Sequence, residues 1–363
     1  MQRHTQAPVT GRRLRSPELQ ADDGFVKVVG NDEPGDGGRD SLYRAAVGQR
    51  KAGSFGAALV TLERLRERYA DFSRLYEELG LCLLALGDVP RAVDAFERSV
   101  LLNPALLSSW SELERLYRAK GDTQKAQVAA GHLARLNELP SALVQAGSLF
   151  SDGDIVAAEQ ILTAFLNERG NHVEALRLLA RIALQRRALE EARVLFEKVL
   201  AAAPQYRAAR ADYARVLIEQ QEPLKARGQL DQLLRLDPGN CDYLTLDATA
   251  SAALGDYERA IAAYRQVLAA QPGWHHVHLL LGNALKAIGR RQEAIEAYKA
   301  AASRRPSFGD AWWSLANLKT YRFAPEEIGR MRAQEAAPAT TLVDRYHLCF
   351  ALGKALEDQG RYE

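Results

Sequence analysis

Small and bulky apolar residues recur along this chain at a nearly constant spacing. An alanine returns every 34 residues, with a single shorter step of 32 residues between Ala126 and Ala158. A Leu or an aromatic residue follows most of these alanines one helical turn later, so the two lie on one face of a helix. The alanines are Ala58, Ala92, Ala126, Ala158, Ala192, Ala226, Ala260 and Ala294. The pattern predicts stacked units of about 34 residues, because one such unit cannot bury its apolar face alone.

Turn residues divide each unit into two predicted helices. Glycine stands five residues before the alanine in six units, and Asp often follows it. These positions are Gly53, Gly87, Gly121, Gly153, Gly255 and Gly289, with Asp88, Asp122, Asp154 and Asp256, while Pro104, Pro204, Pro238, Pro272 and Pro306 end units. Gly accepts the left-handed backbone that ends a helix, Asp caps the next helix, and Pro cannot continue one. Arg187 and Gln221 replace the glycine, so we expect those two turns to close by another geometry. The unit that is two residues short, around Leu139-Pro140, predicts a bend or a packing irregularity.

This pattern resembles the tetratricopeptide repeat over roughly residues 39–320, and Trp110-Leu113-Tyr117 and Leu281-Gly282-Leu285 match its first helix well. The resemblance implies an all-α, right-handed α-solenoid of stacked helix-turn-helix units. First helices would line a concave groove and second helices would cover the outside. It also implies a scaffold for protein–protein interaction that binds a polypeptide in the groove.

The pattern divides the chain into four parts. Residues 1–38 mix Arg, Asp, Gly and Pro without a helical period, which predicts a disordered leader. About eight repeats are expected over residues 39–306, followed by a degenerate repeat over 307–340. Residues 341–363 read as the first helix of a further repeat, so that the array looks truncated. Helices are expected from Pro325 and from about Leu342.

A narrower resemblance concerns the C-terminal part. The segments 312–319, 321–323 and 347–358 resemble the junction at which such repeats precede a sulfotransferase domain in bacterial proteins. This implies the substrate-recruiting or regulatory part of a sulfotransferase, whose catalytic domain lies downstream. No residue here matches that family's phosphosulfate-binding loop, so no catalytic residue is assigned. The alternatives are a free-standing assembly or chaperone-type scaffold, or a repeat region preceding a glycosyltransferase domain. The asparagine ladder associated with the last is weak, present mainly as Asn283 and Asn317.

Candidate peptide-binding residues follow from the inward positions of the family pattern. They are Arg115, Arg118, Arg181, Arg215, Asn283, Lys286 and Asn317. Arg and Lys would bind carboxylates of an acidic or C-terminal peptide, and Asn would bind its backbone. The alternative is that these side chains are solvated or paired with neighbours such as Glu112, Asp212 or Glu219.

The charge and hydrophobicity of the chain argue against nucleic acid and membranes as partners. The 363 residues carry 48 Lys and Arg against 46 Asp and Glu, a net charge of +2, which provides no global attraction for nucleic acid. No apolar run approaches the roughly 18 to 20 residues of a membrane helix. Three separated cysteines predict a reducing, cytoplasmic setting.

We find no catalytic or nucleotide-binding motif, and we expect no cofactor and no enzymatic activity in this chain. The oligomeric state does not follow from the sequence.

One histidine cluster raises the question of a metal. His275 and His278 are three residues apart on a predicted helix, with His276 between them. Zinc takes three or four protein ligands, and no Cys or carboxylate stands nearby at ligand spacing, so we expect no metal site. Trp312 and Trp313 are expected to pack inside the solenoid rather than to form a ligand platform.

Overall fold

The computed structural model describes residues 37–318 and 320–360, and within these ranges the regular backbone is entirely helical. The described helices are α1 Gly37–Lys51, α2 Phe55–Arg68, α3 Ser73–Ala85, α4 Val89–Leu102, α5 Leu107–Lys120, α6 Thr123–Glu138, α7 Ser141–Ser151, α8 Ile155–Arg169, α9 Val173–Gln185, α10 Leu189–Ala202, α11 Arg207–Glu219, α12 Pro223–Leu236, α13 Cys241–Ala253, α14 Tyr257–Ala270, α15 His275–Ala287, α16 Arg291–Arg304, α17 Gly309–Ala316, α18 Pro325–Ala336 and α19 Leu342–Glu357. The expected all-α solenoid is confirmed. The predicted leader, residues 1–38, lies outside the described residues except for Gly37 and Gly38, which begin α1.

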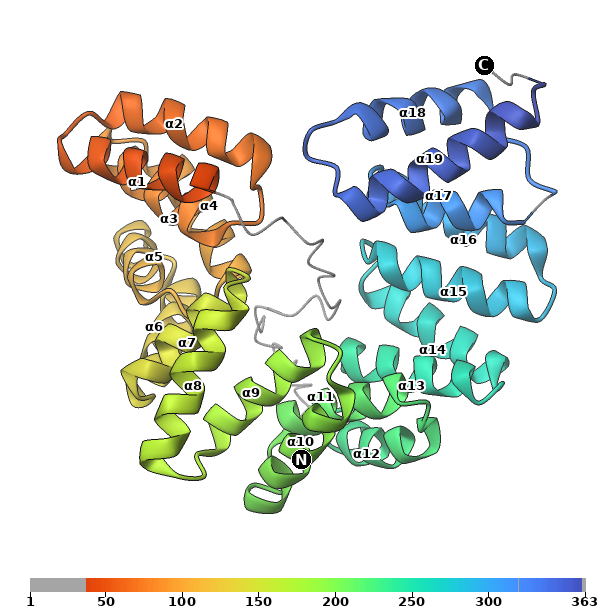
Figure 1. Ribbon diagram of the computed structural model, residues 1–363, viewed down its shortest axis with the longest axis horizontal. Helices are drawn as coiled ribbons and strands as arrows, with labels where there is room; N and C mark the ends of the chain where they lie inside the picture. Colours follow the sequence, from red (N-terminus) through yellow and green to blue (C-terminus); the bar gives the residue numbers. More distant parts are fainter. Residues whose placement is uncertain (1–36, 319, 361–363) are drawn as a thin grey trace, which may run out of the picture.

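The helices pack in consecutive pairs that follow one another along a curved path. Each odd-numbered helix from α1 to α15 packs against the even-numbered helix that follows it. From α7 to α15 the odd-numbered helices also contact one another from pair to pair, while the even-numbered helices stay further apart. The odd-numbered helices therefore form the inner layer of the curve. Figure 1 shows the result, an open ring in which α1–α4 face α17–α19 across a gap.

Aspartates cap the second helices as the sequence predicts. Four of these side chains accept a hydrogen bond from the backbone N–H three residues later, at N–O distances of 3.0 to 3.4 Å. They are Asp88, Asp122, Asp154 and Asp256. Each cap satisfies a backbone donor that the first turn of a helix leaves unpaired.

The turns without glycine do not close by another geometry, and that expectation was wrong. Arg187 and Gln221 have φ angles of 63° and 61°, in the same left-handed region as Gly121 at 78°. The hydrogen bonds also agree. Ala188 N–H donates to Ala183 O at 2.9 Å, as Asp122 N–H does to Tyr117 O. The closing bonds and helix packing impose the turn, and the two side chains accept a strain of about 1 kcal/mol.

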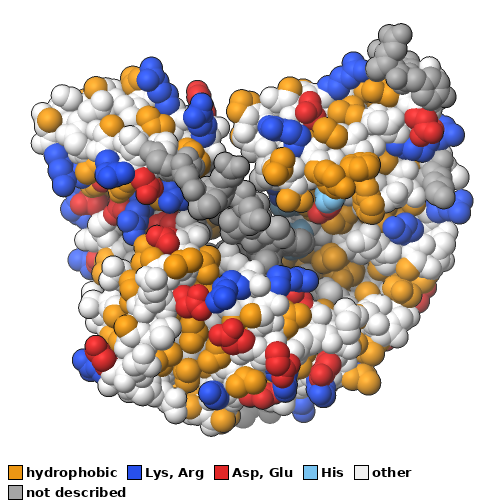
Figure 2. Space-filling model, in the orientation of Figure 1, with side chains coloured by type: hydrophobic (Ala, Val, Ile, Leu, Met, Phe, Trp, Pro, Cys, Tyr) orange, Lys and Arg blue, Asp and Glu red, His pale blue; other side chains and the backbone are white. Residues whose placement is uncertain are grey.

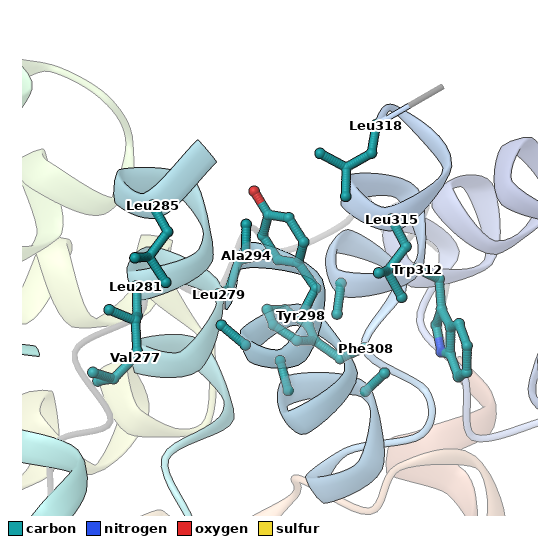
Figure 3. Close-up of a cluster of buried hydrophobic side chains, with 14 of the residues drawn as sticks. Val277, Leu279, Leu281, Leu285, Ala294, Tyr298, Phe308, Trp312, Leu315 and Leu318 are labelled. Atoms are coloured by element: carbon teal, nitrogen blue, oxygen red, sulfur yellow. The ribbon is translucent and has the colours of Figure 1, made fainter. Parts of the chain in front are cut away.

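The core is a series of alanines, most of which have a large side chain one helical turn later. All eight repeat alanines are buried, and so are Phe96, Tyr264 and Tyr298 one turn later. Gly80 and Gly282 provide the room for two of these rings. A Cβ at Gly80 would lie 2.7 Å from the ring of Phe96. Figure 3 shows Tyr298 of α16 lying between side chains of α15 and of α17. The ring therefore joins one repeat to the next.

A polar side chain near the start of several first helices binds the proline turn before it. Trp110 Nε1 donates to Pro104 O at 2.9 Å, and Trp312 Nε1 donates to Pro306 O at 2.8 Å. Such bonds satisfy carbonyls that the preceding helix leaves free. Trp110 and Trp312 therefore each pack in the core and also donate a hydrogen bond to the preceding turn.

The C-terminal helices depart from the pairing of the rest. The helix that follows α17 in the chain, α18, packs against α19, and α19 packs directly against α17. Buried Leu348, Ala351 and Ala355 form the side of α19 that enters the core. The assignment of residues 341–363 to a further repeat remains a prediction. No helix among the described residues is both long and apolar enough to cross a bilayer.

Candidate peptide-binding groove

The inner layer of first helices forms the concave side of the curved array (Figure 1). Figure 2 shows charged side chains below the centre of the ring and apolar side chains over the C-terminal helices. A concave surface of this kind can contact an extended polypeptide along several repeats. The predicted site residues lie on four first helices and at the end of a fifth, in three groups that are considered in turn.

The two arginines of α5 are paired locally. Arg115 lies 2.7 Å from a carboxylate oxygen of Glu112, and Arg118 lies 2.6 Å from one of Glu114. Both arginines are exposed, so these pairs add little to stability. The pairs hold the guanidinium groups along the helix and would have to exchange partners to bind a carboxylate.

The next group combines one arginine of α9 with one of α11. Arg181 is half-buried, with its guanidinium 5.1 Å from the ring centre of Phe150. Arg215 lies 3.8 Å from Asp212, whose other oxygen binds Arg177 at 3.0 Å. Stacking and pairing fix both side chains in place, which lowers the entropy cost of binding a ligand.

The third group lies on α15 and at the end of α17. Asn283, Lys286 and Asn317 are all exposed. Asn283 Oδ1 accepts a hydrogen bond from the Tyr298 hydroxyl at 2.9 Å. This bond orients the amide, leaving its N–H₂ group as the donor for a peptide carbonyl. Asn283 and Lys286 are three residues apart and share one helix face.

An exposed apolar surface joins α17 to α19, and the sequence did not predict it. The exposed fractions are 40% for Trp313, 58% for Tyr346 and 53% for Phe350. The rings of Tyr346 and Phe350 contact each other at 4.7 Å between centroids. We call this surface the apolar stripe; it consists of Trp313, Leu342, Val343, Tyr346 and Phe350.

The apolar stripe corrects the expectation that both tryptophans pack inside the solenoid. Trp312 is 2% exposed, but its neighbour Trp313 points outward. Adjacent residues on a helix face different directions, so only one of the two can enter the core. The signal that could have found the stripe is the spacing of Leu342, Tyr346 and Phe350, which are four residues apart and share a face.

The histidines near the start of α15 face different neighbours. The His275 ring packs edge-on against Phe308, and the His276 ring stacks on Trp274. His278 Nε2 binds Pro272 O at 3.1 Å. Across residues 37–318 and 320–360, no three His, Cys, Asp or Glu side chains come together as metal ligands.

Acidic side chains crowd on α3. Burial, together with the nearby carboxylates of Glu78 and Asp152, raises the pKa of the half-buried Glu77 to about 7. Arg74 and Arg50 act in the opposite direction, but more weakly. Glu77 therefore changes its charge near neutral pH.

Because of Glu77, stability is expected to fall as the pH rises from 5 to 8. The pKa is about 7 in the folded chain, against an ordinary 4.5. The favourable contribution of the protonated group is complete below pH 4.5 and is lost as the pH rises through 7. We expect a loss on the order of 2 kcal/mol that Glu77→Gln abolishes. Urea unfolding of both proteins at pH 5 and pH 8 measures it. Equal pH dependence in the two would contradict the assignment.

Comparisons with known proteins agree with this architecture. The family model of the cytochrome c-type biogenesis protein H TPR domain matches residues 162–273. Two models described as tetratricopeptide repeat match residues 251–318 and 43–105. A search of curated protein sequences found no match.

Several solved structures are similar to this chain. A tetratricopeptide repeat protein from Parabacteroides merdae ATCC 43184 is 13% identical, covers 77% of this chain and 98% of its own, and has a TM-score of 0.46. MamA 41-end from Desulfovibrio magneticus RS-1 is 17% identical over 46% of this chain and 97% of its own, with a TM-score of 0.41. MamA AMB-1 is 20% identical, with coverages of 46% and 99% and a TM-score of 0.41. Taken with the family models that match residues 43–105 and 162–318, the helical repeats identify the chain as a tetratricopeptide-repeat protein.

Proposed function

We propose that this chain is a scaffold that binds a segment of another polypeptide on its inner face, with the apolar stripe as the main anchor. The observation that carries this proposal is the exposure of the rings of Trp313, Tyr346 and Phe350, of which Trp313 and Tyr346 both contact the ring of His347. Aromatic side chains on a surface supply much of the binding energy at protein interfaces when a partner covers them.

The groove residues supply the polar part of the proposed site. Asn283 presents an oriented amide, and Lys286 lies one helical turn further along the same face. An amide donor suits a peptide backbone, and an ammonium group suits a carboxylate. The proposed ligand is therefore a linear segment with apolar side chains for the stripe and an acidic group for the cations.

Removing the aromatic rings of α19 is expected to weaken peptide binding at least about 10-fold. A library of random linear peptides displayed on phage is selected on the wild-type chain. The selected peptides are then titrated against Tyr346→Ala with Phe350→Ala. The control is Leu224→Ala, which truncates a side chain that is 71% exposed on the second helix α12. Equal affinity for all three proteins would overturn the stripe as the anchor.

Charge reversal tests the cations separately. Arg181→Glu and Arg215→Glu are expected to weaken binding of acidic peptides and to leave neutral peptides unaffected. Circular dichroism serves as the control, because Arg215 also lies near Asp212. Unchanged binding of acidic peptides with intact helicity would remove these two residues from the site.

Two further predictions from the sequence, the association with a sulfotransferase and the cytoplasmic location, are also proposals. We propose that the scaffold is the substrate-recruiting or regulatory part of a sulfotransferase, on the resemblance of residues 312–319, 321–323 and 347–358 alone. A free-standing scaffold is equally consistent with the repeats. The gene sequence after the codon for Glu363 distinguishes the two, since only a downstream sulfotransferase domain supports the first. The cytoplasmic location is tested by cell fractionation.

A further inference from the structure

The stacking of the repeats is interrupted between α6 and α7. Every other second helix from α2 to α16 packs against the first helix that follows it, but α6 and α7 make almost no contact. The chain passes from one to the other through Leu139 and Pro140, both in extended backbone conformations. The bend expected at this site is therefore a break in helix packing.

The hydrophobic core is divided at the same place. One cluster of buried side chains extends from Ala46 in α1 to Ala129 in α6. A separate cluster begins at Leu143 in α7 and continues to Ile182 in α9. Further cluster boundaries follow along the chain, but α9, α11 and α13 each contribute buried side chains to two clusters, whereas no helix belongs to both the α1–α6 and the α7–α9 cluster. Shared apolar burial therefore does not connect α1–α6 to α7.

Hydrogen bonds and an ion pair connect the two parts instead. Asp152 at the end of α7 accepts a hydrogen bond from the Ser73 hydroxyl and pairs with Arg74 at 3.2 Å. The amide of Asn103 donates to Ser148 O at 3.1 Å and to Asp152 at 3.3 Å. Ser73 and Asn103 are fully buried. We call these five residues the polar latch.

The latch has the physical properties of a contact that can separate. Its geometry is specific, but the buried charge of Asp152 is stabilised only while its donors stay in place. Opening would return the polar groups to water, which hydrogen-bonds them again. When an apolar junction opens, its side chains gain no hydrogen bonds with water, and the exposed apolar area only costs free energy. Opening at the latch is therefore easier than opening at another repeat junction.

We infer that α1–α6 and α7–α19 are two rigid solenoid segments that hinge at Leu139-Pro140, with the polar latch holding the closed form. The hinge changes the width of the gap between α1–α4 and α17–α19 that Figure 1 shows. This inference concerns the shape of the chain and holds whether or not the inner face binds a peptide.

Breaking the latch is expected to free α7 from α3 and from the α4–α5 turn. Asp152→Ala should speed amide hydrogen exchange in α7 by about 100-fold and increase the radius of gyration measured by X-ray scattering. The matched control is Asp154→Ala, because Asp154 is exposed and only caps α8. Equal exchange and equal size in the two variants would overturn the inference. If the alanine variant does not fold, the same two measurements are made on Asp152→Asn, which keeps the size of the side chain and removes its charge.

A disulfide across the junction tests the movement itself. A Cβ at Gly147 would lie 3.8 Å from the Cβ of Ala105, a separation suited to a disulfide. Ala105→Cys with Gly147→Cys, made with Cys349→Ser to remove the exposed thiol, should lock the two segments. In the Asp152→Ala chain, oxidation should restore slow exchange and the smaller radius, and reduction should reverse both. Fast exchange in the oxidised form would mean that α7 unfolds locally, which also overturns the hinge.

Discussion

Gly309→Ala is expected to lower the free energy of unfolding by about 3 kcal/mol, because α17 and α19 meet backbone to backbone at this residue. An added Cβ would lie 2.9 Å from Asp344 Cα and 2.8 Å from His347 Cβ, and closer still to Asp344 O. Backbone atoms cannot move aside as the end of a side chain can. Gly309 N–H also donates to Asp344 Oδ1 at 3.0 Å, so separation of the helices loses this bond too.

The control for this substitution lies on the same pair of helices. Gly353→Ala in α19 places a Cβ where no other atom lies within 4 Å. It is expected to leave stability unchanged or raise it by up to about 1 kcal/mol, since Ala favours a helix over Gly. Chemical denaturation followed by circular dichroism compares the two. A similar effect of both substitutions would contradict the close approach at Gly309.

Asp212→Ala is expected to cost about 3 kcal/mol by leaving a buried guanidinium without its main partner. Arg177 lies 3.0 Å from Asp212, and the side chains are 14% exposed for Arg177 and 8% exposed for Asp212. Burial alone would lower the pKa of Arg177, but Asp212, Tyr206 and Glu174 raise it above its ordinary value. The charge therefore stays in the interior when its partner is removed.

Thermal unfolding of three proteins tests this ion pair. Asp231→Ala, at an exposed position of α12, removes the same side chain at a site where its loss should be nearly neutral. The double variant Asp212→Ala with Arg177→Met should recover part of the lost stability, because the buried charge is gone. A melting temperature for Asp212→Ala equal to that of the control would contradict the pairing.

The repeat period made most of the fold predictable. Each repeat alanine is the fourth residue of a second helix and marks the same close approach, so these eight positions determined the pairing of helices from α1 to α16. Asp88 and Asp122 signalled caps that the structure contains. Local rules sufficed wherever a repeat contacts only its neighbours. The bond from Ser73 of α3 to Asp152 after α7 joins repeats that are not neighbours, and no local rule predicts it.

The rest depends on contacts that no local rule describes. The left-handed turns at Arg187 and Gln221 are imposed by the closing hydrogen bonds, which outweigh the preference of each residue. The packing of α19 against α17 depends on Gly309 and Asp344, which are 35 residues apart. The site residues Arg115 and Arg215 lie on first helices, and their pairing with Glu112 and Asp212 is the alternative that the sequence offered, since each pair is three residues apart on one helix.

The divided core also bears on how the chain folds during synthesis. Residues up to Glu138 contain every buried side chain of the α1–α6 cluster, and they leave the ribosome before α7. Domains that are made first generally fold first, and in repeat arrays folding spreads from one unit to its neighbour. The break at Leu139-Pro140 stops that spread, so the second segment must nucleate anew. Refolding is therefore expected to show two kinetic phases, with the first one retained in a chain that stops at Leu139.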